Sequence, residues 1–557
     1  MIRCKWEIVE SSKPTSVDEV VEIILQNRGV ARSFLTGSLK DLEPYLTMKG
    51  MQEGAALMAQ HLDAGNKVVL VGDYDCDGVT SVAQLAHFLR DIGYANYAMV
   101  IPRRAEGYGV PERAVSQHSD AGLFVAMDCG THDIRSVRAA RSQGSDFIVI
   151  DHHEVSSHEV APATVLINPK QPHSLCGFKE FSAAGLTLLF LARLRQAIGE
   201  RFATPKLGGK YLALAALGTV ADLMPLVDAN RVLARSGLCC MNTKTYPPLK
   251  ELSERAGLSA KVLTAGHIGY YLGPRINAAG RMGDASLALD LLMAEHGQEA
   301  GRLAVELNQL NTRRQHQEEH ILSQVRGRYS EEHAARRTLV MADDGWSPGV
   351  VGIIASRIQR ELHYGPTVIF AIDGDTGLAR GSARSIPGFD IYAAVQSCKD
   401  LLLKWGGHKM AAGMTVAGEN LEKFSQRFEE IARTHSPELF IPRGKIDVEL
   451  DLPFVSTELF NALKQLEPHG VGNPLPTFAA RPIKVAVQRL FGKDNKHAQL
   501  LLDDRIEAIF WRGGQCLPLG CRNGDRMDVV FQLAWDDFRN RLSLTVRDLG
   551  ELNTLWF

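Results

Sequence analysis

The sequence predicts an α/β protein of several domains: a parallel-sheet domain, a helical region with a long connector, a smaller α/β domain and a C-terminal β-barrel. Its 557 residues exceed the roughly 250–300 at which a single hydrophobic core stops growing. Short apolar runs alternate with helical stretches over residues 66–170, which is typical of a parallel sheet covered by helices. From residue 446 onward, closely spaced alternating runs indicate a small antiparallel barrel.

Five apolar runs form the predicted parallel sheet: Val68–Val71, Tyr97–Ile101, Leu123–Met127, Phe147–Ile150 and Val165–Ile167. Helical stretches such as residues 80–90 separate them, as parallel strands require. Ligands of such sheets bind beyond the C-terminal strand ends. The residues that directly follow each run are therefore the candidates for a site.

The middle of the chain, residues 183–300, is mostly helical in pattern and leads into a long polar helix from about residue 301 to 329. We expect this helix to connect two domains. Strand and helix signals resume in a second α/β segment at Thr338–Ala342, Val350–Leu362 and Thr367–Ala371. The barrel strands are expected at Gln499–Leu502, Ala508–Trp511, Asp528–Ala534 and Leu542–Val546.

Composition narrows the class of protein only slightly. The formal net charge is −2, so binding of nucleic acid would need a locally basic groove. The nine cysteines form no CxxC pair, which favours free thiols in a reducing compartment. No run of about 18 apolar residues is present to cross a membrane. We therefore expect a cytoplasmic protein without a membrane partner.

The first predicted strand runs directly into an acidic turn. Asp73, Asp75 and Asp77 stand within five residues of one another at this strand end. Hard divalent cations prefer such oxygen ligands. Because carboxylates this close repel one another, burying them without a cation would be costly, and a bound metal explains their spacing. The alternative is a solvated acidic turn that bends at Gly78.

Further metal-type residues follow two other predicted strands. Asp128 follows one strand, and Asp151-His152-His153 follows the next. A mixed set of carboxylates and imidazoles suits Mn²⁺ better than a purely oxygen site does. A histidine pair is often an ordinary surface or core feature, but the position after a strand favours a ligand role. Asp222, which ends the string Gly218–Asp222, is equally well explained as a helix cap or a turn residue.

Taken together, Asp73-x-Asp75-x-Asp77, Asp128, Asp151-His152-His153 and Gly218–Asp222 resemble the four metal-site motifs of the DHH phosphoesterases. Within that superfamily the chain resembles the RecJ nucleases from about residue 50 to the barrel. The strings that carry this resemblance are Ile101–Arg104 with Gly107–Gly109, Leu272–Arg281, Trp346–Gly352, Gly381–Ser385 and Gly406–Gly413. Two departures are Ala383 and Cys129, where the family usually has Gly and Asn.

The resemblance implies a DHH domain, a DHH-associated domain and an OB-fold barrel. The expected division is an N-terminal extension at 1–50, the DHH catalytic domain at 51–235, a helical region with the connector at 236–335, the DHH-associated domain at 336–440 and the OB-fold at 441–557. It also implies hydrolysis of phosphodiesters with two Mn²⁺ or Mg²⁺ ions. The implied metal ligands are Asp75, Asp77, Asp128, His152 and Asp222, and the implied catalytic residues are His153 and Asp73.

The implied substrate is single-stranded DNA, digested from its 5′ end during DNA repair and recombination. The implied substrate-binding residues are Arg103, Arg104, Arg275, Asn277, Arg281, Ser382, Arg384 and His408. Arg275 and Arg281 are expected on a loop beside Gly273, Pro274 and Gly280. Arg313 and Arg314 are further candidates, although a solvated face of the connector explains them as well.

Two more segments have both a functional and a purely structural interpretation. Gly381–Ser385 could hold a terminal phosphate through Ser382 and Arg384, or could be a polar turn between strands. Phe491 and Trp511, with Lys493, Lys496 and His497, could stack and bind a single strand, or the two aromatic rings could belong to the barrel core.

Other functions compete with the exonuclease. They are a DHH phosphodiesterase for short oligonucleotides or cyclic dinucleotides, a non-catalytic replication scaffold and an inorganic pyrophosphatase. The extra barrel and the complete set of metal-type residues favour the exonuclease over all three. Similarity to RecJ further suggests a single-stranded-DNA-binding protein and a repair helicase as partners.

Overall fold

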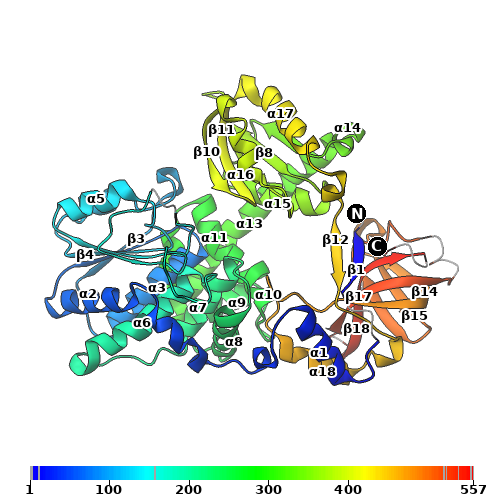
Figure 1. Ribbon diagram of the computed structural model, residues 1–557, viewed down its shortest axis with the longest axis horizontal. Coiled ribbons are helices and arrows are strands. Elements are labelled where there is room, and N and C mark those ends of the chain that lie inside the picture. Colours follow the sequence, from blue (N-terminus) through cyan, green and yellow to red (C-terminus); the bar gives the residue numbers. More distant parts are fainter. Residues whose placement is uncertain are drawn as a thin grey trace. The chain divides into compact units, whose positions relative to one another are not determined.

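The computed structural model describes residues 4–9, 13–155, 159–518, 521, 524–536, 539–551 and 555. The chain forms two compact units, which we describe separately (Figure 1). The N-terminal unit contains residues 32–314 together with the short segment 466–474. The C-terminal unit contains the remaining described residues, including the start of the chain.

The N-terminal unit contains the predicted five-stranded parallel sheet, with strand order β3-β2-β4-β5-β6. Its strands are β2 (Val68–Gly72), β3 (Tyr97–Val100), β4 (Leu123–Met127), β5 (Asp146–Ile150) and β6 (Val165–Ile167). The observed bounds differ from the predicted ones by one residue at most. Because all strands run in the same direction, their carboxyl ends meet at one edge of the sheet.

Successive residues of each strand belong to two different hydrophobic cores, one on each face of the sheet. Leu70 and Val125 pack with the helices of one face, whereas Val69 and Val71 pack with those of the other. The first face is covered by α2 (Met51–Asp63), α3 (Cys76–Asp91), α6 (Ala183–Ile198) and α7 (Lys210–Ala221), and the second by α4 (Glu112–Gln117) and α5 (Ile134–Ser142). This two-sided burial explains why the strands read as continuous apolar runs.

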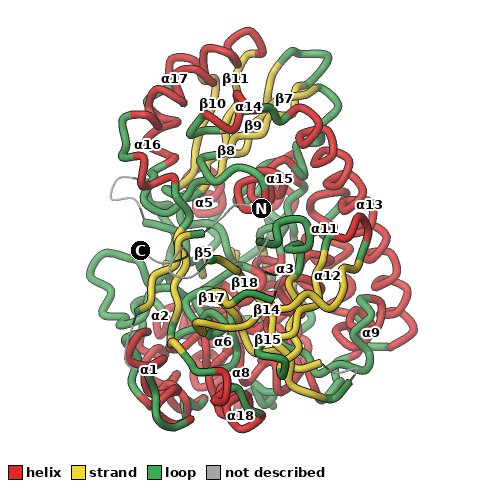
Figure 2. Tube along the Cα trace, turned by 90° about the vertical axis from the view of Figure 1, so that its right-hand side faces the viewer, coloured by secondary structure: helices red, strands yellow, loops and turns green. Residues whose placement is uncertain are grey.

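Further helices follow the sheet along the chain. They are α8 (Asp228–Asn242), α9 (Pro247–Arg255), α10 (Ala265–His267), the π-helix Ile268–Leu272, α11 (Gly273–Met282), α12 (Ser286–Met293) and α13 (Gly297–Arg328). The connector α13 is one continuous helix, four residues longer at its start than predicted (Figure 2). It begins in the N-terminal unit and continues into the C-terminal unit.

The expectation that Arg275 and Arg281 lie on a loop is wrong, because both residues belong to α11. Pro274 is the second residue of α11, at the point where the π-helix Ile268–Leu272 passes directly into this helix. Gly273 lies against Ala221 of α7, so that an added Cβ would be 2.9 Å from the Cβ of Ala221. The glycine therefore serves close packing, and neither residue interrupts the helical backbone.

A mixed sheet forms the second α/β part of the chain, in the order β10-β11-β9-β8-β7. Its strands are β7 (Leu339–Asp343), β8 (Thr367–Ile372), β9 (Leu378–Arg384), β10 (Leu402–His408) and β11 (Ala411–Ala417). The helices of this part are α14 (Glu331–Ala335), α15 (Val351–Glu361), α16 (Ile391–Gln396) and α17 (Leu421–Arg433). Residues 381–384 thus lie inside a strand, which excludes the polar turn considered as their alternative.

The C-terminal barrel closes through pairing of its first and fourth strands, β14 and β17. Its strands are β14 (Phe478–Phe491), β15 (His497–Leu502), β16 (Ile506–Phe510), β17 (Arg526–Asp536) and β18 (Arg541–Gly550), and β13 (Val448–Glu449) pairs with β14 from outside. The prediction of a purely antiparallel barrel is wrong in one respect, since β16 and β18 pair in parallel. β14 escaped prediction because Pro482, at a register shift, interrupts its pattern.

The described start of the chain packs beside this barrel. β1 (Lys5–Ile8) pairs in parallel with β12 (Arg443–Ile446), and Trp6 packs with Val530 of β17. Two helices, α1 (Val17–Asn27) and α18 (Thr457–Leu463), complete this region. Among the helices that the structure describes, none has the length and apolar character needed to cross a membrane.

Candidate active site

The acidic turn after β2 is held by hydrogen bonds to two helix starts. Asp75 caps α3, because its carboxylate accepts the backbone N–H groups of Asp77 and Gly78 at 2.9 and 3.2 Å. Asp77 is buried, and its carboxylate accepts the N–H groups of Ala183 and Ala184 at 2.7 and 2.9 Å. These last two groups begin α6, where the helix dipole also favours a negative charge.

Glycines allow the surrounding backbone to approach this turn. A Cβ on Gly218 would lie 2.6 Å from Asp77 Oδ1 and 2.5 Å from the Cβ of Ala184. A Cβ on Gly78 would lie 2.4 Å from the backbone nitrogen of Asp73. Larger residues at these positions would therefore push the carboxylates apart.

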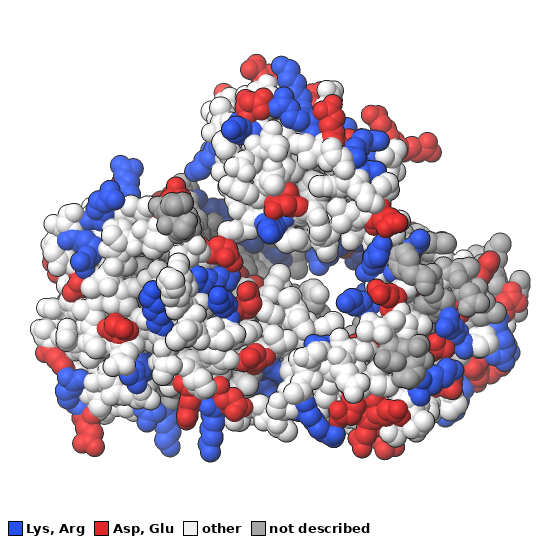
Figure 3. Space-filling view, in the orientation of Figure 1, with Lys and Arg blue, Asp and Glu red and all other residues white. Residues whose placement is uncertain are grey.

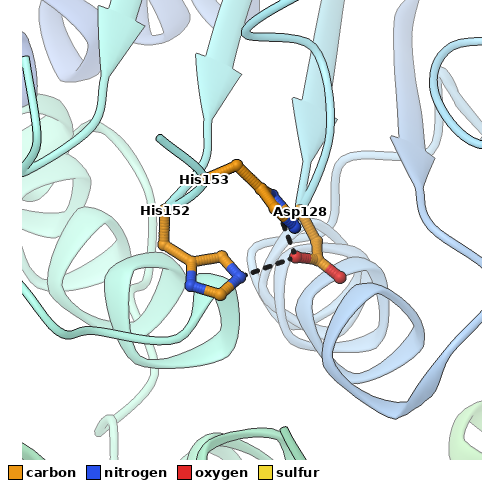
Figure 4. A group of neighbouring side chains, drawn as sticks. All are labelled: Asp128, His152 and His153. Atoms are coloured by element: carbon orange, nitrogen blue, oxygen red, sulfur yellow. Dashed lines mark hydrogen bonds and ion pairs between the residues drawn. The ribbon is translucent and has the colours of Figure 1, made fainter. Parts of the chain in front are cut away.

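Four functional side chains meet around the imidazole of His152. Its Nε2 atom lies 3.1 Å from Asp128 Oδ1, 3.6 Å from Asp222 Oδ2 and 3.8 Å from Asp77 Oδ2. The His153 ring faces the same Asp128 oxygen at 4.0 Å (Figure 4). Asp222 is the C-cap of α7, so its position at a helix end and its place in this cluster are compatible.

Asp151 positions the two histidines rather than joining the cluster. Its Oδ1 atom accepts the backbone N–H groups of His152 and His153 and lies 2.7 Å from Nδ1 of the His153 ring. Its other oxygen accepts the N–H of Thr131 at 3.2 Å. Such outer carboxylates fix the orientation and tautomer of a metal-binding histidine.

The electrostatics of the cluster favour a bound cation. Burial, reinforced by the neighbouring charge of Asp75, raises the pKa of Asp73 to about 8 and that of Asp77 to about 7. Burial also raises the pKa of Asp128 and Asp222, and it lowers the pKa of His152 to about 3. The cluster is thus a set of buried carboxylates beside a neutral imidazole, which is the donor set that divalent cations bind.

The positions of the side chains fit metal binding as well. Three groups of ligand atoms lie within 4.8 Å of one another: Asp73, Asp75 and Asp128; Asp77, His152 and Asp222; and Asp128, His152 and His153. In addition, the buried Oδ1 atom of Asp73 accepts no hydrogen bond among the described residues. An oxygen of this kind is costly unless an ion or water contacts it.

The structure brings together the five residues predicted as metal ligands and the two predicted as catalytic residues. The predicted substrate-binding residues fall into two groups. Arg103, Arg104, Arg275, Asn277 and Arg281 belong to the N-terminal unit, whereas Ser382, Arg384 and His408 belong to the C-terminal unit. Asn277 reaches the acidic turn, where its Oδ1 atom accepts the N–H of Cys76 at 2.6 Å.

Sequence reasoning did not single out Tyr108 as a site residue. Its hydroxyl donates to the carbonyl of Asp128 at 2.9 Å and lies 3.0 Å from Nδ1 of His153. The string Gly107–Gly109 contributed to the resemblance to RecJ, but nothing in it indicated a role for the hydroxyl of Tyr108; both glycines have positive φ. Nothing in the sequence indicated that the backbone N–H groups of Ala183 and Ala184 would bind Asp77.

Comparison with known proteins agrees with this arrangement. Three family models match the chain: the DHH family N-terminal domain over residues 67–219, the DHHA1 domain over 336–434 and the RecJ OB domain over 446–548. The single-stranded-DNA-specific exonuclease RecJ of Escherichia coli is 33% identical, with 96% of each chain covered. RecJ of Bacillus subtilis is also 33% identical, over 97% of this chain and 70% of that protein.

The chain belongs to the RecJ family. A crystal structure of RecJ from Thermus thermophilus in complex with Mn²⁺ covers all of this chain and 80% of its own, with a TM-score of 0.82 and 29% identity. A second structure of the same protein, in complex with Mg²⁺, has a TM-score of 0.77 and 27% identity. Membership in RecJ confirms the DHH superfamily predicted from the four metal-site motifs and the RecJ family predicted from the longer strings outside them.

Proposed function

We propose that this protein is a metal-dependent exonuclease that digests single-stranded DNA from its 5′ end. The observation that carries the proposal is the convergence of five carboxylates and two histidines at the carboxyl edge of the parallel sheet. The RecJ relatives, which are named single-stranded-DNA-specific exonucleases, support the same substrate. Phosphodiester hydrolysis in DNA repair and recombination is part of the proposal.

In this proposal Asp75, Asp77, Asp128, His152 and Asp222 hold two Mn²⁺ or Mg²⁺ ions. When bound, two such ions provide an activated water and neutralise charge on the phosphate. Asp73, whose Oδ1 atom has no protein partner among the described residues, is available to orient a ligand.

In this proposal His153 donates a hydrogen bond to the scissile phosphate. Burial alone would lower the pKa of its ring, but the hydrogen bond with Asp151 and the charges of Asp75 and Asp73 raise it. The Asp151 carboxylate lies at Nδ1, which leaves Nε2 to hold a proton toward a phosphate oxygen.

Arginines near the acidic turn are the proposed DNA contacts of the N-terminal unit. The Arg104 guanidinium lies 5.6 Å from the ring centroid of Tyr74, and Gly280, the neighbour of Arg281, packs against Tyr74. Arg275 is held by Asn308 and by the carbonyl of Tyr271. Arg314 is unsuited to this role, because it is 8% exposed and bonded to Asn311. Its burial also contradicts the solvated face considered as its alternative.

The barrel offers a stacking surface for a single strand. Trp511 is 53% exposed, and its ring packs edge-on against those of Phe491 and His497. Lys493 and Lys496 are exposed on the intervening segment. Exposed aromatic rings beside cations bind bases without sequence preference. Exposure of Trp511 favours this role over a place in the barrel core.

A terminal phosphate site is proposed around Arg384. Its half-buried guanidinium donates to Ser382 Oγ at 3.0 Å, and no carboxylate contacts it within the part of the chain that the structure describes. Ser382 and Arg384 lie on one face of β9, and His408 is in register with Arg384, two strands away. The first turn of α15 is adjacent, since a Cβ on Gly352 would lie 3.0 Å from both side chains. Helix starts and guanidinium groups both favour phosphate.

Replacing Arg384 by alanine should therefore abolish the preference for 5′-phosphorylated over 5′-hydroxyl strands without loss of the metals. A lost charge-assisted hydrogen bond of this kind typically costs about 1.5–3 kcal/mol, or a factor of about 10 to 100 in the rate on phosphorylated strands. The measurement compares both substrates side by side, with metal content determined in parallel. Exposed Arg380, on the same strand, is the matched control. Unchanged discrimination in Arg384→Ala would place end recognition elsewhere, with Arg103 or Arg104 the next candidates.

The proposed function is tested by digestion of single strands labelled at either end. With Mn²⁺ or Mg²⁺ we expect release of short products from the 5′ end of single strands, little digestion of duplex and no digestion with EDTA. Cleavage only of dinucleotides or cyclic dinucleotides would favour the phosphodiesterase alternative. Absence of any cleavage would favour the scaffold.

Further assignments belong to the same proposal. A single-stranded-DNA-binding protein and a repair helicase are the proposed partners, and the cytoplasm is the proposed location, because both follow from a role in DNA repair. The division into an extension, a DHH domain, a helical connector, a DHH-associated domain and an OB-fold, with the limits given above, is also retained.

A further inference from the structure

A short segment from the C-terminal part of the chain packs against the loop that carries Asp222. Residues 466–474, which we call the strap, cluster with residues 32–314, although the residues on both sides of the strap belong to the C-terminal unit. The strap contacts residues 222–227, which we call the Asp222 loop. This loop directly follows α7 and leads into α8.

The strap is held against the Asp222 loop and the start of α8 by hydrogen bonds and by close packing. The N–H of Leu226 donates to the carbonyl of Val471 at 2.7 Å. Gly472 has φ +73, and a Cβ there would lie 2.9 Å from the Cβ of Pro225. Arg231, at the start of α8 and only 3% exposed, donates to the carbonyl of Glu467. The strap therefore packs closely over the loop and is hydrogen-bonded to it.

Asn473 determines the shape of the strap. Its side chain is fully buried and donates to the carbonyls of Leu466 and Pro468 at 2.7 and 2.9 Å. Its backbone exchanges two hydrogen bonds with Gly470. One side chain thus closes the strap into a compact turn that presents Val471 to the loop.

The strap reaches two of the proposed metal ligands through this loop. Asp222 begins the loop as the C-cap of α7, and Leu223, next to it, has φ +59, the left-handed conformation that ends this helix, since the N–H of Met224 donates to the carbonyl of Thr219 at 3.2 Å. Asn230 links the loop to a second ligand, because its amide donates to the carbonyls of Pro225 and Glu180. Glu180 leads into the start of α6, whose N–H groups bind Asp77.

We propose that the strap is a positioning element of the metal site and that Asn473 holds it in the shape that keeps Asp222 in place. The proposal rests on the proposed metal site and extends it to a segment more than two hundred residues away in sequence. Without the strap, the hydrogen bond of Leu226 and the packing against Pro225 are lost, so the Asp222 loop can shift and carry the carboxylate of Asp222 away from His152. Loss of an outer contact of this kind typically weakens metal binding by about 10- to 100-fold.

The test is Asn473→Ala, with Mn²⁺ binding measured by calorimetry on the full-length protein without DNA. We expect the Kd for the weaker Mn²⁺ ion to rise by about tenfold or more. The Mn²⁺ concentration for half-maximal digestion should rise in parallel, whereas KM for a single strand and kcat at saturating Mn²⁺ should stay within about twofold. A general loss of stability would lower kcat at every Mn²⁺ concentration.

Gly472→Ala is the second variant, because its Cβ would push the strap from Pro225 and leave the Asn473 hydrogen bonds in place. Asn461→Ala is the matched control, since Asn461 is exposed on α18 and bonds only to the nearby Lys464 among the described residues. Wild-type Mn²⁺ affinity in both strap variants, or an equal loss in the control, would overturn the proposal. Because binding is measured without DNA, a wild-type protein that binds Mn²⁺ but digests no single strand would contradict the exonuclease and leave this test intact.

Discussion

Replacing Asp128 or His152 by alanine is expected to lower the rate of single-strand digestion by about 10³-fold or more, the scale on which enzymes lose a group that stabilises charge in the transition state. Asp128 belongs to two of the three ligand groups, one with Asp73 and Asp75 of the acidic turn and one with the two histidines. His152 contacts Asp77, Asp128 and Asp222 at once. Removing either side chain therefore disturbs both proposed ion positions.

The rate is measured at saturating Mn²⁺ on 5′-phosphorylated single strands, with circular dichroism to verify the fold. Asp120→Ala is the matched control, because Asp120 is an exposed carboxylate just before β4 that pairs with Lys67. Asp128→Ala should remain folded, since removing a carboxylate from a crowded acidic cluster relieves repulsion. His152→Ala removes a neutral imidazole, so the spectrum of this variant is the direct check of its fold. Near wild-type activity of either variant at saturating Mn²⁺ would refute the assignment of the site.

The metal site was predictable because its residues follow strands, and strands that are buried on both faces are easily recognised. Asp128 and Asp151 each directly follow a continuous apolar run, so the parallel sheet brings them to the same edge. Asp222 was harder, because it follows a helix and a local pattern cannot distinguish a C-cap from a ligand. Only the folded chain places it 3.6 Å from His152.

The parts that sequence reasoning missed depend on contacts between distant segments. α11 looked like a loop because Gly273, Pro274 and Gly280 are read as breakers. In the folded chain Gly273 packs against Ala221 and Gly280 against Tyr74 within a helix. The N–H groups of Ala183 and Ala184 belong to the backbone and leave no mark on residue type. The strap is a turn rich in glycine and proline, and its contacts with the Asp222 loop appear only in three dimensions.

Binding of single strands should weaken steeply with salt, although the net charge of the chain is −2. Acidic and basic side chains are interspersed on the face that Figure 3 shows, so the total charge says little about any one groove. The proposed DNA contacts of the N-terminal unit that are not deeply buried are five arginines: Arg103, Arg104, Arg275, Arg281 and Arg313. If each displaces a counterion, affinity falls with a log–log slope of about −3.5, or about 100-fold between 50 and 200 mM salt.

The variants Arg275→Ala and Arg281→Ala should each reduce this slope by about 0.7, because each removes one phosphate contact of a single strand. Affinity is measured by fluorescence anisotropy with a labelled oligonucleotide. The buffer contains Ca²⁺ in place of Mn²⁺, because Ca²⁺ is a hard cation that also takes oxygen ligands. Each variant is checked for absence of cleavage under these conditions. Arg302→Ala on α13 serves as the control, since Arg302 is exposed and pairs with Glu306, so its loss should leave the slope unchanged. A wild-type affinity that does not vary with salt would exclude an electrostatic groove. Equal slopes in all three variants would place the phosphate contacts on other cations of the chain, and those cations would then supply the salt-dependent part of the affinity.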